Sequence, residues 1–236
     1  MRSLSRGVST LSTMFYFLLS SLPALAWHDK THLSVAEAAG FDLWYSAAAP
    51  DVAKSKTEFK AAEEKNHYFN NNAHREVDEA IVMAQVERYN KPDDLEGHLY
   101  GAIIAAVRAS ESERESGKYA EYPLVFCAHY IGDLSMPLHN TEYDEFNTNH
   151  HSTNDATIEG SVRNNIGYIQ RNMRAMTIKS EADLAREIAK VANAARRLGY
   201  KLRAENRDMT QDEAYRQVIE SASLLKAVLV YVGKKP

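Results

Sequence analysis

The sequence is poor in cysteine, and this scarcity excludes two common ways to stabilise a chain or to bind a metal. Its one cysteine is Cys127, so no disulfide can form within the chain. A metal site built from several thiolates is excluded for the same reason. Cys127 stands two residues before His129 and could still be a single thiolate ligand, but we favour a small buried apolar residue.

Apolar runs long enough to span a membrane are lacking too, and the run near the start of the chain is short. A basic N-terminal stretch is followed by MFYFLLSSL at 14–22 and by Ala-Leu-Ala at 24–26. This order is typical of a secretory signal peptide. We therefore predict residues 1–26 as a signal peptide and 27–236 as an exported mature chain, periplasmic or secreted. The alternative, an uncleaved membrane anchor, would need about 20 apolar residues.

The chain also has no excess of positive charge, which limits the partners that it can attract over a distance. Removing residues 1–26 takes away Arg2 and Arg6, so Lys and Arg fall from 28 to 26 against 32 Asp and Glu, a net charge of −6. Such a balance argues against broad, charge-driven adhesion to nucleic acid or to anionic membranes. It is compatible with a local site where bound cations supply the positive charge.

Glycine and proline are few, at 10 and 6 residues, and we find no alternating strand pattern bounded by turn residues. Apolar residues instead recur at helical spacing over most of the chain. We predict an all-α, single-domain helical bundle over 27–236, with the apolar segment 124–134 at its centre. Helices are also expected within 31–44, 77–89, 93–107, 153–176, 181–198 and 210–232, with a charged turn at 110–118 and a polar connector at 201–208.

Histidine and aspartate are grouped in a way that suggests a metal site. The stretch HYIGDLSMPLHN places His129 and Asp133 four residues apart, and therefore on one face of a helix. Pro137 should end that helix and turn His139 around a corner while keeping it close. The segment HSTND at 151–155 repeats the His-x-x-x-Asp spacing at what we expect to be a helix start. A single histidine is more often structural, but imidazole and carboxylate together are the ligands that suit zinc.

HYIGDLSMPLHN resembles the signature of the zinc-dependent phospholipases C and the related single-strand-preferring zinc nucleases, a superfamily of helical enzymes with three zinc ions. The resemblance extends from Trp27 to about Asp155. In that superfamily a Trp begins the mature chain and binds zinc through its amino and carbonyl groups, and Trp27 directly follows the predicted cleavage point. The metal ligands implied here are Trp27, His32, Asp51, His67, His129, Asp133, His139, His151 and Asp155.

The resemblance also implies how these residues divide among three zinc ions. One zinc would be held by Asp51, His67, His129 and Asp133. A second would be held by Trp27, His32 and Asp133, so that Asp133 bridges the pair. A third, more separate zinc would be held by His139, His151 and Asp155.

Two assignments within this set stay open on the sequence alone. The region around Asp51 has no tight motif, so Asp42 or Glu58 could replace Asp51 as the upstream ligand. His150 competes with His151, but only His151 has a carboxylate four residues later. The histidines left over, which we expect to be solvated or structural, are His28, His74 and His98.

The chemistry that the resemblance implies is hydrolysis of a phosphoric diester. Two close zinc ions can share a water, lower its pKa and hold it as hydroxide for attack on phosphorus, while the third stabilises the developing charge. Asp51, or a neighbouring carboxylate, could orient the attacking water, which makes Asp51 the candidate catalytic residue. Lys54 could neutralise the phosphate, although a solvent-facing lysine is the simpler expectation.

The choice between a phospholipid and a single-stranded nucleic acid as substrate is close. The five-residue step from Trp27 to His32 and the terminal Asp155 are typical of the nucleases, whereas the eleven residues between His139 and His151 favour the phospholipases. We predict an exported zinc phosphodiesterase of phospholipase C type, with the nuclease as the alternative. A non-catalytic, zinc-stabilised binding protein is the second alternative, and no protein partner is predicted. Aromatic residues expected beside the site are Tyr68, Phe69, Tyr143 and Phe146.

Overall fold

The structure is a computed structural model that describes residues 27–56 and 58–233, so the predicted signal peptide lies outside the described residues. The described part is all-α, with ten α-helices and no strand, which confirms the predicted fold class. None of these helices combines the length and the apolar character needed to cross a bilayer. The helices are α1 (Asp29–Ala38), α2 (Ala49–Lys54), α3 (Lys60–Lys65), α4 (Glu79–Val86), α5 (Leu99–Glu115), α6 (Glu121–Leu134), α7 (Glu145–Asp155), α8 (Ile166–Asn172), α9 (Glu181–Glu205) and α10 (Gln211–Tyr231), with 3-10 helices η1 (Trp44–Ser46), η2 (Pro137–Asn140) and η3 (Val162–Asn165).

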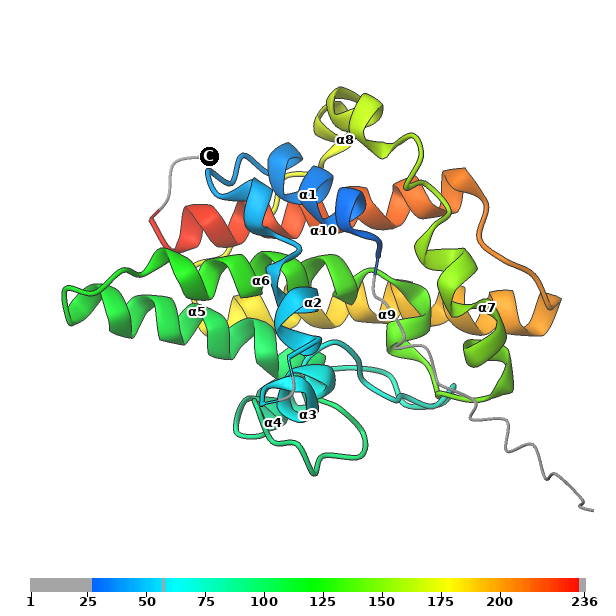
Figure 1. The fold of residues 1–236 in the computed structure, drawn as a ribbon, viewed down its shortest axis with the longest axis horizontal. Helices are drawn as coiled ribbons and strands as arrows, with labels where there is room; N and C mark the ends of the chain where they lie inside the picture. Colours follow the sequence, from blue (N-terminus) through cyan, green and yellow to red (C-terminus); the bar gives the residue numbers. More distant parts are fainter. Residues whose placement is uncertain (1–26, 57, 234–236) are drawn as a thin grey trace, which may run out of the picture.

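Helix α6 lies at the centre of the bundle, as its apolar sequence predicts (Figure 1). It packs against α5, α10, α1, α2 and α9. Tyr130, Ile131 and Leu134 are fully buried in the main apolar core. Because the helix is surrounded in this way, His129 and Asp133 are buried in the interior as well.

A second, smaller apolar cluster joins the start of α1 to the turn that follows α6. Trp27, directly before α1, is fully buried in this cluster. Met136 and Leu138 belong to the same cluster, and they flank or lie in η2. The packing that holds the beginning of α1 therefore also holds the short helix that carries His139.

The segment 153–176 is not one continuous helix as predicted, because it holds only the end of α7, η3 and α8. The prediction that His151 begins a helix is wrong. Helix α7 begins earlier, because the side chain of Asp144 caps it and accepts a hydrogen bond from the backbone N–H of Asn147 at 3.0 Å. His151 and Asp155 therefore lie in the last turns of α7. Their four-residue spacing still places both side chains on one face.

Helices α5 and α9 are longer than the sequence patterns predict. The charged segment 110–118 continues α5 because its Glu, Ser and Arg residues tolerate a helix, and the chain turns only at Gly117, with φ of +70°. Most of the expected connector 201–208 continues α9, which ends at Asn206 in the left-handed conformation, with φ of +48°. The start predicted for α5 is too early, since Leu95 precedes the helix and is 84% exposed.

Candidate metal centre

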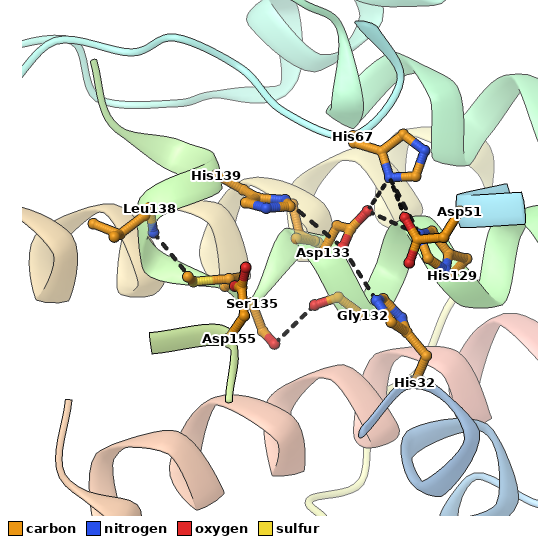
Figure 2. Close-up of polar contacts among 12 residues, drawn as sticks. His32, Asp51, His67, His129, Gly132, Asp133, Ser135, Leu138, His139 and Asp155 are labelled. Carbon is orange, nitrogen blue, oxygen red and sulfur yellow. Dashed lines mark hydrogen bonds and ion pairs between the residues drawn. The ribbon is translucent and has the colours of Figure 1, made fainter. Parts of the chain in front are cut away.

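Three groups of histidine and aspartate side chains lie inside the bundle, close enough to bind metal ions. Figure 2 shows the first two groups around Asp133, with His139 and Asp155 of the third. In each group the potential ligand atoms lie within 4.8 Å of one another. The groups are His32, His129 and Asp133; Asp51, His67 and His129; and His139, His151 and Asp155. The structure thus brings together all eight side chains that the sequence singles out, from positions 32 to 155.

Short segments from across the chain position these side chains. Helix α6 lies at the middle and presents two of them on one face, while α1, α2 and the residues after α3 approach it from other directions. The contributions are His32 from α1, Asp51 from α2, His67 after α3, His129 and Asp133 from α6, His139 from η2, and His151 and Asp155 from α7. Pro137 begins η2, so the chain turns there and His139 is directed back toward α6.

The carboxylate of Asp133 lies between the first two groups of side chains, which also share His129. Its Oδ2 lies 2.8 Å from Nδ1 of His67 and 3.3 Å from Nε2 of His129. Its Oδ1 lies 3.3 Å from Nε2 of His32 and 3.7 Å from Nδ1 of His139. Since each oxygen faces a different pair of imidazoles, one carboxylate can serve two neighbouring ions.

The third group is linked to the others but forms a distinct position. Nε2 of His139 lies 3.0 Å from Nε2 of His151, which in turn lies 3.5 Å from Oδ2 of Asp155. Asp155 is fully buried, and neither of its carboxylate oxygens makes a hydrogen bond within the described part of the chain. Burial raises the pKa of Asp155 well above its ordinary value. Without a cation this group stays protonated, and a metal ion would favour its ionised form, with two facing imidazole nitrogens as suitable co-ligands.

Hydrogen bonds at the outer ring nitrogens orient two of these histidines. Nδ1 of His129 donates to the carbonyl oxygen of Ala47 at 2.8 Å. Nδ1 of His151 donates to Oδ1 of Asn147 at 2.7 Å, while the amide nitrogen of Asn147 donates to the carbonyl oxygen of Leu138 at 2.8 Å. With the proton held at Nδ1, a neutral ring carries its lone pair on Nε2, which in both cases faces the metal groups.

Glu63 also belongs to the centre, although it is not among the ligands that the sequence predicts. Its Oε1 lies 3.3 Å from Nε2 of His67, whose other nitrogen faces Asp133. Glu63 is buried and also accepts hydrogen bonds from the Tyr130 hydroxyl at 2.7 Å and from the Asn66 amide at 3.1 Å. A carboxylate behind a ligating imidazole fixes the ring and raises its basicity. The Glu-x-x-x-His spacing on the sequence is the signal that could have revealed this pair.

The structure places Asp51, and not Asp42 or Glu58, beside the other ligands. Oδ1 of Asp51 lies 3.9 Å from Nδ1 of His67 and 3.8 Å from Nε2 of His129. Both alternative carboxylates are exposed at the surface. The position of Asp51 follows from α2 packing against α3 and α6, which no local sequence pattern reveals.

Lys54 is buried, which corrects the expectation of a solvent-facing lysine. Its side chain is 7% exposed, and its Nζ lies 2.8 Å from Oδ1 of Asp51, one turn earlier on α2. Lysine is rarely buried unless it is paired. The positive charge of Lys54 therefore stands at the edge of the metal groups, next to one of their ligands.

The electrostatics of the centre favour a positive charge among its carboxylates. Burial by itself lowers the pKa of His129, but Asp133 and Asp51 outweigh it and raise that pKa to about 9. Burial opposes the ionisation of Asp133 as well, yet His129 and His139 hold its pKa well below the usual range. Burial lowers the pKa of His139 to about 4, so this ring is neutral at pH 7 and can act as a ligand.

The remaining histidines and Cys127 lie outside the three groups. His150 pairs with Asp208 at 2.7 Å, at the outer side of α7. His98 is buried in a structural role and hydrogen-bonds Asp94 and Asn66. The others are His28, directly before α1, and His74, which is exposed. Cys127 is fully buried with its sulfur 3.9 Å from the carbonyl oxygen of Ile103, which agrees with the apolar role that we favoured.

The aromatic residues expected beside the site differ in what they can contact. Phe69 is fully buried and packs edge-on against Tyr100 in the core, so it is not available to a substrate. Phe146 stacks on His150, with ring centroids 4.2 Å apart. Tyr143 is 56% exposed and is the most accessible of the four. Phe69 therefore contributes to core packing, and a substrate contact stays open only for the other three.

Trp27 is the ninth residue of the implied ligand set, and it would act through its backbone. The structure places it directly before α1, fully buried, five residues from His32. The three groups consist of side chains, so zinc binding by the terminal amine and the carbonyl of Trp27 stays a prediction. The burial of the indole explains why the start of α1 is held firmly against the rest of the molecule.

The donor set fits a metal ion of borderline hardness. Imidazole and carboxylate are the only ligand types in the three groups, and no thiolate takes part. Neither a scan of protein-family models nor a search of curated proteins gives a match to this chain. What the protein does is therefore inferred from the residues of the centre itself.

Proposed function

We propose that this chain is an exported, zinc-dependent phosphodiesterase of phospholipase C type. The observation that carries the proposal is the position of Asp133, which offers one oxygen to His67 and His129 and the other to His32 and His139. A site for structural zinc usually closes with four ligands around one ion. A bridging carboxylate with a further His/Asp group beside it is instead suited to several ions acting on one substrate.

The residues present are suited to zinc. One ion would be held by Asp51, His67 and His129, with Asp133 beside them. A second would be held by His32 and Asp133, next to His129. A third would be held by His139, His151 and Asp155. Zinc bound in this way supplies positive charge for the phosphate and lowers the pKa of a water molecule that attacks phosphorus.

Lys54 and Asp51 would act on the substrate directly. The ammonium group of Lys54 is held by Asp51 beside the metal groups, where it can bind a non-bridging phosphate oxygen. The carboxylate of Asp51 would accept a hydrogen bond from the attacking water and orient it. Because the chemistry uses water as the nucleophile, no serine or cysteine nucleophile is required.

A single-strand-preferring nuclease is the second candidate. The five-residue step from Trp27 to His32 and the Asp at position 155 support it. The exposed ring of Tyr143, near the start of α7, could stack on a base. The two candidates share the metal centre and differ in the part of the substrate that is recognised.

An assay of three substrate classes tests the proposal. The processed, zinc-loaded chain would be incubated with phosphatidylcholine, with single-stranded DNA and RNA, and with a chromogenic phosphodiester. We expect release of the phosphorylated head group from phosphatidylcholine, loss of that activity with a chelator and its recovery on adding zinc. The matched variants are Lys54→Met, which should slow the reaction, and Lys60→Met, an exposed lysine whose loss should not.

The other results of this assay would each favour a different function. Cleavage of single-stranded nucleic acid without lipid cleavage would favour the nuclease. A chain that binds zinc, unfolds when zinc is removed and cleaves none of the substrates would be a zinc-stabilised binding protein, and the proposal would be wrong.

A variant with one extra residue before Trp27 tests the role of the terminal amine. The added residue moves the amine away from the centre, so we expect the loss of one zinc ion while the helical content is unchanged. If the variant keeps all of its zinc and its full rate, the terminal amine is not a ligand.

A further inference from the structure

A cavity of about 800 Å³ lies between α2, α3, α5 and α6, apart from the three metal groups. Ligand sites in proteins typically have volumes of about 300–1,000 Å³. All but three of its lining residues are apolar or aromatic, and the exceptions are Lys56, Glu63 and Asn90. The cavity is therefore large enough for a small molecule, and its apolar lining favours a ligand with a hydrocarbon part.

The edge of this cavity is formed by apolar side chains that are exposed. Val52 is 59% exposed, Phe59 is 56% exposed and Tyr122 is 60% exposed, and all three line the cavity. Deeper in, Ala106 is buried and Phe126 is partly buried. Exposed apolar residues gathered around one opening are typical of a binding site, because leaving them in water costs free energy.

The polar lining residues show where a charged group of a ligand would lie. Glu63 already accepts hydrogen bonds from Tyr130 and Asn66, and Asn90 accepts one from Asn66 at 2.8 Å. Lys56 is exposed at the edge of the cavity and makes no ion pair with the described residues. A ligand with an apolar body and one negative charge therefore matches this lining.

We propose that the cavity binds a free medium- or long-chain fatty acid, with the hydrocarbon chain inside and the carboxylate beside Lys56. One lysine complements one negative charge, whereas a nucleotide would need hydrogen-bond partners that the apolar lining does not offer. The net charge of −6 of the mature chain also opposes docking to an anionic lipid surface. This site borders the metal centre through Glu63, but its ligand is not the phosphodiester.

Titration calorimetry with dodecanoate on the processed, zinc-loaded chain tests the proposal. We expect saturable binding of one dodecanoate per chain and no binding of propionate, which has the same carboxylate without the chain. Ala62→Trp should fill the cavity and weaken binding at least about tenfold, equivalent to losing two buried methylene groups. Ala61→Trp is the matched control, because its neighbouring position is exposed and does not line the cavity, and it should bind normally.

Two charge variants test the position of the carboxylate and do not depend on a buried substitution. Lys56→Gln should weaken binding of dodecanoate but not of uncharged dodecanol, while Lys60→Gln should change neither. Phe59→Asp places a negative charge at the opening and should repel dodecanoate, and Asp is a favourable residue at this N-cap position of α3.

Several results would overturn the proposal. One is the absence of dodecanoate binding to the zinc-loaded chain, and another is equal binding by the Ala62→Trp and Ala61→Trp variants. A third is binding of propionate as tightly as dodecanoate, because this result would place the carboxylate at the metal. Binding to anionic vesicles without binding of the free acid would assign the cavity to a lipid surface instead. Zinc content, measured on every variant, separates these results from a failure of the metal centre.

Discussion

Asp133 shows how strongly one residue depends on its surroundings. It is fully buried, and four imidazole rings approach its two oxygens. A carboxylate in such a place would be costly without compensating charge, and breaking a buried pair leaves an uncompensated group. The two oxygens of Asp133 therefore depend on the surrounding histidines, and a metal ion between them would supply further positive charge.

Asp133→Asn should remove metal from the two groups that it joins. Asparagine keeps the size of the side chain but loses the negative charge, so both neighbouring ions lose a ligand. We expect the phosphodiesterase rate to fall by at least about a hundredfold, since even residues behind the ligands contribute up to that much. Metal analysis and the rate would be measured beside Asp42→Asn, an exposed control. Unchanged zinc content in Asp133→Asn would contradict the bridging role.

Glu63→Gln should weaken zinc binding without unfolding the chain. Glutamine can still hydrogen-bond Tyr130 and Asn66, but it no longer increases the basicity of His67. We expect the zinc affinity of that position to fall by about 10–100-fold. Competition with a chelator of known affinity measures this, with the exposed neighbour Glu64→Gln as the control. Equal affinity in the two variants would mean that Glu63 has only a packing role.

Cys127 should be unreactive in the folded chain. Burial raises the pKa of its thiol to about 12, so at pH 8 the thiol stays protonated and lacks the nucleophilic thiolate. A disulfide reagent at pH 8 should therefore label it only after denaturation, with one equivalent per chain. Rapid labelling of the native, zinc-loaded protein would show that Cys127 is accessible and that α6 is less well packed than described.

At the scale of helices, α1 and α6 approach each other closely at Gly132. A Cβ atom on Gly132 would lie 2.5 Å from Nδ1 of His32, closer than real Cβ contacts allow. The glycine of the HYIGDLSMPLHN stretch therefore makes room for a ligand from another helix. This also explains why a glycine stands between His129 and His139 inside an otherwise apolar helix.

Gly132→Ala should disturb the first metal group specifically. The new methyl group either displaces His32 or separates the two helices, and such overpacking costs about 1–3 kcal/mol in the free energy of unfolding. We expect reduced zinc content together with a lower urea midpoint. Gly160→Ala is the matched control, because no atom lies within 4 Å of its would-be Cβ. The same zinc content in both variants would contradict the close approach.

Periodicity predicted which segments are helical better than it predicted where each helix begins and ends. Helix α10 lies within the predicted range 210–232, and the apolar pattern of α6 identified the central helix. The end of α5 could not be predicted, because a run of charged residues is compatible with both a helix and a turn. The cap at Asp144 that moves His151 to the end of α7 was overlooked, although its residue type is a usual N-cap.

For the whole molecule, the all-α class followed from composition and periodicity, but the convergence of the ligands did not. His129 and Asp133 are neighbours through local helix geometry, so their pairing was predictable from spacing alone. The approach of Asp51 to His67 depends on how α2, α3 and α6 pack, and only the resemblance of the sequence suggested it. No local sequence pattern predicts the cavity lined by Lys56, because its lining residues come from several separate helices.

Removal of zinc should lower the melting temperature of the entire chain. The buried carboxylates of Asp133 and Asp155 would lose their counter-charge, and any ligand that binds only the folded state stabilises it. One site with zinc at 100 times its dissociation constant contributes about 2.7 kcal/mol. For a chain of this size that corresponds to about 5–10 °C per site. Calorimetry before and after dialysis against a chelator measures the shift, and an unchanged melting temperature would contradict internal metal binding.

The most direct measurement is the number and the position of bound zinc ions in the processed chain. Elemental analysis should give about three zinc per chain, and anomalous scattering at the zinc edge should place them beside Asp133, beside His32 and between His139, His151 and Asp155. Zinc absent after loading at neutral pH, or scattering peaks away from these side chains, would contradict the metal centre and the function proposed for it.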